Sequence, residues 1–496
     1  MAVGADPLPW EIDPYRTQVW IEPDASCHVD DGFVTRLGDR LQQQGYATSG
    51  AVMRTSYQMA PLPLRRWMSE SADPARFAEQ LKELGIEPYQ CDRVHLISLE
   101  LDGDWKIRFR EFDSLTQSFG AVHEASVQQR ELVSSAILRL SYAKFAPLAR
   151  VNEVQKSNIT LTARGATLVE EEAISRTQRW SEAVGQIPPA EDTEVDWEAL
   201  PAAAPSESPL PETVPGMIGP GEALQPVLRR NDRQGNLVAN GIVFMPWTYI
   251  RCEENDGLQL KGSMVSGYSQ AMPGRRNVRT QRLAIGIRPL FDATTLKLVD
   301  KTSEDTPLAG YEIYAKNADG PELVGASDAN GKVVIPNDPK NSVRLLYVRS
   351  GGNLLARLPV VPGFEQSTTA RITNDGPRLL AEGFVEGWRD QLIDTMARRQ
   401  ILSQRVERKI EEGEIEEAER WLAALRSGRT VNELAFDLRT AKGQFLKDNK
   451  LDPTIKRRID QLFEKGQRLV AQDKSLLVEG KLARDLEAAK KNATQP

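Results

Sequence analysis

The sequence contains little of the side-chain chemistry on which metal sites and most enzymes depend. Its 496 residues include three cysteines (Cys27, Cys91 and Cys252) and three histidines. Three scattered cysteines cannot build a disulfide framework. So few histidines leave little material for metal binding or for acid–base catalysis. We therefore predict no metal and no cofactor.

A basic excess and long apolar runs are also missing. The net charge of −7 argues against a nucleic-acid-binding protein, which would need a substantial basic surface. No uncharged apolar run approaches the ~20 residues that a membrane-spanning helix requires. We therefore expect neither nucleic acid nor an integral membrane segment. The apolar share of 40% and the charged share of 27% are typical of globular chains, and the length predicts several domains.

Recognisable catalytic motifs are absent from the sequence as well. It has no Gly-x-Ser-x-Gly, no Walker-type phosphate loop and no Gly-x-Gly-x-x-Gly after a strand. The neighbours Cys27 and His28, together with Cys91 and His95, could offer ligands to zinc. No second ligand pair supports such a site, so we interpret the cysteines as small buried residues and the histidines as incidental neighbours. An enzyme, either metal-dependent or hydrolytic, with its site in the N-terminal domain is kept as an alternative.

An acidic, proline-rich segment divides the chain. Residues 186–222 hold eight prolines, eight acidic residues and no lysine or arginine. Proline interrupts helices and sheets, and unpaired like charges repel, so this segment is predicted to be extended. Acidic residues continue upstream, and we assign 169–221 to an acidic, proline-rich linker.

The hydrophobic pattern predicts a multidomain α+β protein. Residues 1–168 form a mixed α/β head domain with a strand–turn–strand unit around Asp102-Gly103, a dipeptide that favours tight hairpins. In its second strand the odd-numbered residues from Trp105 to Phe109 form an apolar face, and we expect the opposite face to meet solvent. A further strand of the head is predicted at Ser157–Thr167.

The remaining domains follow the linker. Short strands between turn residues predict a small β-barrel over 222–297, similar to an SH3 barrel. Further strands predict a β-sandwich over 298–376. Apolar residues spaced four apart predict a helical tail over 377–496, in which Asp452 is the N-cap of a helix that starts at Pro453.

One of the β modules resembles a known family. A strand that opens with Pro307-Leu-Ala-Gly310, the turn Ser327-Asp-Ala-Asn-Gly331 and the apolar strand Val343–Val348 resemble the transthyretin-like, carboxypeptidase-regulatory-type β-sandwich. The resemblance covers residues 300–375 and implies a non-catalytic module. It also implies a secreted or envelope protein, and the whole arrangement resembles large bacterial envelope proteins that end in helices.

An arginine-rich segment is the most distinctive polar feature. Arg275, Arg276, Arg279 and Arg282 lie on or beside a predicted loop that follows Tyr268. Arginine binds carboxylates and phosphates through two parallel hydrogen bonds. We therefore predict that these five residues bind an anion or an acidic peptide. The alternative is a solvated arginine-rich hairpin that protects a sheet edge.

Trp197 is the one tryptophan inside the acidic, proline-rich segment 186–222. A short acidic segment with an aromatic residue can act as a docking peptide for a partner. We predict that role for Trp197.

We interpret the whole chain as a non-enzymatic binding or scaffold protein. Its expected partner is a protein or an anionic envelope polymer, and its helical tail is a candidate for self-association. The small residues Val3, Gly4 and Ala5 resemble the end of a signal-peptide cleavage site, so a secreted or envelope location is favoured over a cytoplasmic one. A cytosolic adaptor that acts through its helical region is the third alternative.

Overall fold

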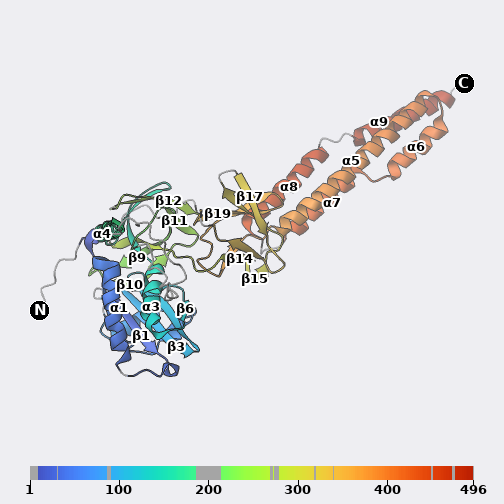
Figure 1. Cartoon of the computed structure of the whole chain (residues 1–496). Coiled ribbons are helices and arrows are strands. Elements are labelled where there is room, and N and C mark those ends of the chain that lie inside the picture. The colour runs from blue at the N-terminus through green and yellow to red at the C-terminus, as the bar shows by residue number, and fades with distance from the viewer. Residues whose placement is uncertain are drawn as a thin grey trace, which may run out of the picture.

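The computed structural model describes residues 9–30, 32–86, 91–185, 214–257, 259–268, 272, 279–317, 320–338, 340–447, 451–471 and 475–494. It confirms a multidomain α+β protein (Figure 1). Three β-containing units form a body, and a bundle of helices projects from that body as an elongated arm. Trp197, Arg275 and Arg276 lie outside the described residues.

The head is built on a mixed sheet. Its strands run in the order β2-β1-β3-β4, and β5 and β6 both pair with β4. The central strand β1 is parallel to β2 and to β3, whereas β3 and β4 form an antiparallel hairpin. The strands are β1 (Tyr15–Pro23), β2 (Met53–Met59), β3 (Arg93–Asp102), β4 (Asp104–Asp113), β5 (Ser118–Phe119) and β6 (His123–Val127). Gly103 has φ +75° at the turn between β3 and β4, which confirms the predicted hairpin.

Helices cover both faces of the head sheet. Helices α1 (Phe33–Ser49) and α3 (Val133–Ala143) pack on the face that carries Ile107 and Phe109, as the alternation in β4 predicted. The opposite face was predicted to be wet, and this is wrong at the end of β4. There, α2 (Pro74–Glu83) covers Phe112, and buried Arg110 donates hydrogen bonds to three backbone carbonyls.

The β-barrel is composed differently from the prediction. Six antiparallel strands follow one another in the order β9-β11-β12-β8-β7-β13, and a pairing between β13 and β9 closes the ring. Strand β10 (Leu237–Phe244) pairs with β9 outside the ring. The ring strands are β7 (Leu148–Gln155), β8 (Asn158–Ala163), β9 (Ala223–Asn231), β11 (Thr248–Asn255), β12 (Leu260–Ser266) and β13 (Thr280–Gly286).

Two of these strands come from a region that the sequence assigned to the head. The barrel is therefore not formed by 222–297 alone, because β7 and β8 precede the linker and pair with β13 and β12 beyond it. A strand pattern identifies a strand but not its distant partner, and this is why the prediction failed. Helix α4 (Ala166–Gly185) also occupies residues 169–185, which were assigned to the linker, whereas most of the segment predicted to be extended lies outside the described residues. The start of α4 is rich in glutamate, which favours helix.

Because strands from both sides of the linker form the barrel, cleavage of the linker should not separate the two parts of the chain. A protease site introduced between residues 196 and 201 and then cleaved should leave the two fragments bound, because β7 and β8 remain paired with β13 and β12. Size-exclusion chromatography should show one peak at the volume of the uncut chain. Two separate peaks would contradict the shared barrel.

Two four-stranded sheets share one hydrophobic core after the barrel; we call this unit the double-sheet module. In one sheet β14 is flanked by β18 and the parallel β21, and also pairs with β15; the other has the order β17-β16-β19-β20. Their inner side chains, among them Leu298, Ile313 and Leu346, form the common core. The strands are β14 (Ala293–Asp300), β15 (Ser303–Pro307), β16 (Glu312–Asn317), β17 (Gly320–Ala326), β18 (Lys332–Pro336), β19 (Arg344–Ser350), β20 (Asn353–Val360) and β21 (Ser367–Ile372).

The predicted turn between β17 and β18 is present. The carboxylate of Asp328 accepts hydrogen bonds from the backbone N–H groups of Asn330 and Lys332, both at 2.8 Å. Gly331 has φ +73°, and a Cβ atom there would lie 2.4 Å from the carbonyl oxygen of Leu298. Glycine is therefore required at this position.

The arm is organised around one long helix. Helix α5 (Gly376–Glu411) has 36 residues and is about 54 Å long at 1.5 Å per residue. Helices α7 (Val431–Leu446) and α8 (Pro453–Ala471) pack on its first half around Trp388, whereas α6 (Ile415–Ser427) and α9 (Ser475–Thr494) pack on its second half around Val406. Figure 1 shows these two layers in sequence along the arm.

Ionic contacts join the arm to the double-sheet module. Arg378 near the start of α5 is buried, contacts Asp375 through two hydrogen bonds from Nε and one from Nη2, and donates another to the backbone of Ser350. Asp452 pairs with Lys301 at 2.6 Å and also accepts from the N–H of Thr454, which confirms it as an N-cap. Across the described ranges, no helix has the combination of length and apolar character that a membrane crossing needs.

Candidate functional site

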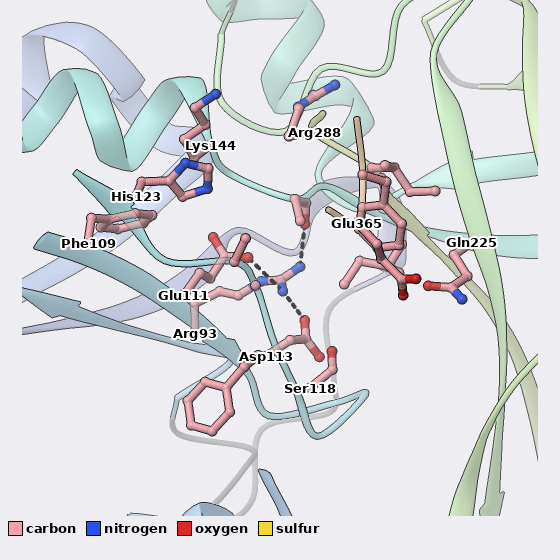
Figure 2. Close-up of a pocket in the computed structure, with 18 of the residues that line it drawn as sticks. Arg93, Phe109, Glu111, Asp113, Ser118, His123, Lys144, Gln225, Arg288 and Glu365 are labelled. Atoms are coloured by element: carbon pink, nitrogen blue, oxygen red, sulfur yellow. Dashed lines mark hydrogen bonds and ion pairs between the residues drawn. The ribbon is translucent and has the colours of Figure 1, made fainter. Parts of the chain in front are cut away.

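A pocket of about 370 Å³ lies where the head, the barrel and the double-sheet module meet (Figure 2). The head contributes ionisable side chains from the ends of β3, β4, β6 and α3. The barrel contributes β9, β10 and the end of β13, and the double-sheet module contributes the segment after β20. The polar members of the lining are Arg93, Glu111, Asp113, Ser118, His123, Lys144, Gln225, Arg288 and Glu365.

Arg93 is the centre of a buried ionic cluster on one side of this pocket. Its side chain is fully buried and forms ion pairs with Asp113 and, at 3.1 Å, with Glu111. Its Nη2 donates to the carbonyl oxygen of Ala146 at 2.6 Å, and Nε2 of His95 lies 3.2 Å from Glu111. A buried charge is costly unless it is paired, and the two carboxylates pair this one, although Nε of Arg93 has no hydrogen-bond partner among the described residues.

The strand register explains why the cluster forms. In the β3–β4 hairpin Arg93 lies directly opposite Asp113, and His95 lies opposite Glu111, all on one face of the sheet. Burial alone would raise the pKa of Glu111, but Arg93, His95 and a backbone hydrogen bond outweigh it and lower that pKa below its usual value. Glu111 is therefore held as a carboxylate beside Arg93.

A second group of basic side chains lines the pocket beside this cluster. His123 is 6% exposed, and within the described part of the chain its Nδ1 has no hydrogen-bond partner. Figure 2 shows Lys144 beside it. Among the described residues no carboxylate lies within ion-pair distance of Lys144. Arg288, by contrast, pairs with Glu222 at 2.6 Å and donates to the carbonyl oxygen of Phe145.

The protonation states of this group follow from burial and from mutual repulsion. Burial, followed by the charge of Lys144, lowers the pKa of His123 to about 4. Burial and the charge of Arg288 lower the pKa of Lys144. At neutral pH the pocket therefore presents a neutral imidazole, and in the part of the chain that the structure describes neither its Nδ1 nor the neighbouring Lys144 has a carboxylate partner.

The pocket is better equipped for binding than for nucleophilic chemistry. Its hydroxyl group, Ser118, hydrogen-bonds the hydroxyl of Thr116 at 2.8 Å. Thr116 in turn donates to Asp113, whose carboxylate is engaged by Arg93. A nucleophile needs a base within hydrogen-bond reach, and no such pair is formed by the described side chains that line this pocket.

The cysteines and histidines considered for zinc do not converge on one site, and His28 is exposed. All three cysteines are buried and free. Cys91 packs in the cluster around Trp20 and donates to the carbonyl oxygen of Arg93, whereas His95 contacts Phe109 on the other face of the sheet. In the described ranges no group of three or more His, Cys, Asp or Glu side chains gathers that could hold a metal ion.

The described residues of the predicted anion site lie in the barrel. Arg282 is in β13 opposite Leu228, and Arg279 immediately precedes that strand. Tyr268 is 56% exposed and lines a different pocket, of about 410 Å³, with Trp247 and neighbours from β20. Anion binding by this segment stays a prediction, as does docking by Trp197.

The sequence analysis missed the pocket of Figure 2, although a signal for it was present. Glu111 and Asp113 continue the odd-numbered face of β4 that carries Ile107 and Phe109. A charged residue at a core position of a strand requires a buried partner, and Arg93 supplies it. The third unit, which brings Glu365 to the pocket, could not be inferred from such a pattern.

Comparison with known protein families and with curated proteins finds no match to this chain. The interpretation of the site therefore depends on its geometry and charges.

The buried cluster predicts that replacing either of two arginines in the same hairpin will change the stability of the protein by very different amounts. Arg93→Ala should lower the free energy of unfolding by about 3–5 kcal/mol, because it leaves two buried carboxylates unpaired. The control Arg108→Ala removes an exposed pair with Glu124 and should cost less than about 1 kcal/mol. Urea denaturation measures both values, and equal effects would refute the role of the cluster.

The low pKa of His123 predicts how the stability of the protein depends on pH. Its folded-state pKa of about 4 is below the ordinary 6.5, so the unfolded chain binds more protons between these values. The contribution of His123 to stability is therefore present above pH 6.5 and is lost as the pH falls towards 4. NMR titration of ¹⁵N-labelled histidine should show the low pKa, and Lys144→Met should raise it. A midpoint near 6.5 in the wild-type protein would contradict the burial argument.

Proposed function

We propose that the protein is a non-enzymatic binding and scaffold protein in which the arm associates with a second copy of the chain. The observation that carries this proposal is an exposed apolar patch around Ile393 and Ile401 on α5, which the exposed side chains of Glu386 and Asp390 separate from Leu379. Leu379, Ile393 and Ile401 are 38%, 56% and 53% exposed. At 3.6 residues per turn they lie within about 80° of one another. Buried Trp388 and Val406 lie on the opposite side of the helix.

The charge of the arm supports a second copy as the occupant of this patch. Residues 377–496 carry 24 basic and 21 acidic side chains, so their net charge is 24 − 21 = +3. Both signs occur along the arm and nearly balance, so two arms can lie together without strong net repulsion. Apolar side chains that face water gain free energy when a partner covers them.

In this function the barrel and the double-sheet module present binding surfaces to a partner. We propose that the double-sheet module is a transthyretin-like β-sandwich and that the barrel is similar to an SH3 barrel, both without catalytic activity. Arg279, Arg282 and Tyr268 would then offer a protein or an anionic envelope polymer a point of contact, in a secreted or envelope location. The order of the units in Figure 1, with the arm projecting from the body, supports this division of roles.

Sedimentation velocity of the full chain over a range of concentrations tests the association. We expect a concentration-dependent dimer that the double substitution of Ile393→Glu and Ile401→Glu weakens at least ten-fold. The matched control, Val334→Glu, changes a residue of β18 that is 59% exposed and should leave the dimer unchanged. A wild-type chain that stays monomeric, or a control that weakens the dimer equally, would refute the proposal.

A further inference from the structure

The pocket of Figure 2 has the size and the polar contacts of a small-molecule site. Its volume of about 370 Å³ is within the range of ligand-binding pockets. Three separate units line it, and ligand sites occur preferentially at such junctions. The site is in the body, so the argument is independent of association through the arm.

The buried histidine indicates that the pocket is incomplete without a ligand. Nδ1 of His123 has no partner among the described residues, although the side chain is 94% buried at 6% exposure. Leaving a buried polar atom without a hydrogen bond is unfavourable, because the atom has lost its contacts with water and gained none in return. A ligand atom that meets this nitrogen would remove that cost.

The charges around the pocket indicate which end of a ligand would lie beside His123. Glu111 and Asp113 are both paired with Arg93 and are not available to a cation. Lys144 has no carboxylate at ion-pair distance within the described part of the chain. The uncompensated charge on this side is therefore positive, and a carboxylate would pair with Lys144 while accepting a hydrogen bond from His123.

The opposite side of the pocket has a different character. Figure 2 shows Gln225 and Glu365 there, away from Lys144 and His123. Glu365 is exposed, and its carboxylate has no ion pair among the described residues. A second negative charge on the ligand would be repelled here, whereas an amino group would be attracted.

We propose that this pocket binds a small amino carboxylate, an amino acid in the general sense, with its carboxylate at Lys144 and His123 and its amino group at Glu365. Gln225 lines the pocket on the side of Glu365 and offers its amide as a further hydrogen-bonding group. The backbone around these groups is fixed by the ionic cluster of Arg93, so the site is formed before the ligand binds.

Calorimetric titration of the full chain with four probes tests the assignment. The probes are 4-aminobutyrate, butyrate, n-butylamine and inorganic phosphate. We expect 4-aminobutyrate to bind most tightly, butyrate at least ten-fold more weakly, and n-butylamine not at all. The ¹⁵N signal of His123 should move on binding, whereas that of the buried His95, which is paired with Glu111, should stay in place.

Two variants test the two ends separately. Lys144→Met should weaken binding of 4-aminobutyrate at least ten-fold, and Glu365→Gln should remove its advantage over butyrate. Lys106→Met, on the exposed side of β4, is the control and should bind as the wild type does. Failure of all four probes to bind, tighter binding of phosphate or n-butylamine, or an unchanged affinity in Lys144→Met would overturn the proposal.

Discussion

The buried pairing of Arg93 with Glu111 and Asp113 is the interaction on which the arrangement of the body depends. It joins the first residue of β3 to the last residues of β4 and, through the carbonyl of Ala146, to the chain that enters the barrel. Burying a guanidinium group is unfavourable unless all of these contacts form together. The hairpin register and the entry to β7 are therefore fixed by the same side chain.

Other buried arginines repeat this connection between the head and the barrel. Arg164, which follows β8, reaches back to Asp92 beside β3 at 2.7 Å. Arg229 in β9 donates to the carbonyl of Leu115, just after β4, at 2.7 Å. Each contact links a barrel strand to the edge of the head sheet from which the pocket is formed. Buried ion pairs and hydrogen bonds therefore join the head to the barrel beside the pocket.

Local features of the fold could be predicted from the sequence, and long-range ones could not. The turns at Asp102-Gly103 and Asp328–Gly331 and the N-cap at Asp452 depend on a few neighbouring residues, so their chemistry is visible in the sequence. Strands β7 and β8 belong to the barrel because they pair with β13 and β12. Strand β13 follows β7 by more than a hundred residues, so no local pattern reveals this pairing. The pocket could not be predicted for the same reason, because it combines side chains from three units. Only the charged residues at core positions of β4 indicated that a buried polar site was present.

Hydrogen exchange measured by mass spectrometry on the wild type and on Arg93→Ala tests directly whether head and barrel form one body. Peptides from β3 and β4 report on the head, and peptides from β9 and β13 report on the barrel. If the buried arginine holds both units together, exchange accelerates in both sets of strands in the variant. Barrel peptides that keep their wild-type protection while β3 and β4 lose theirs would contradict this account.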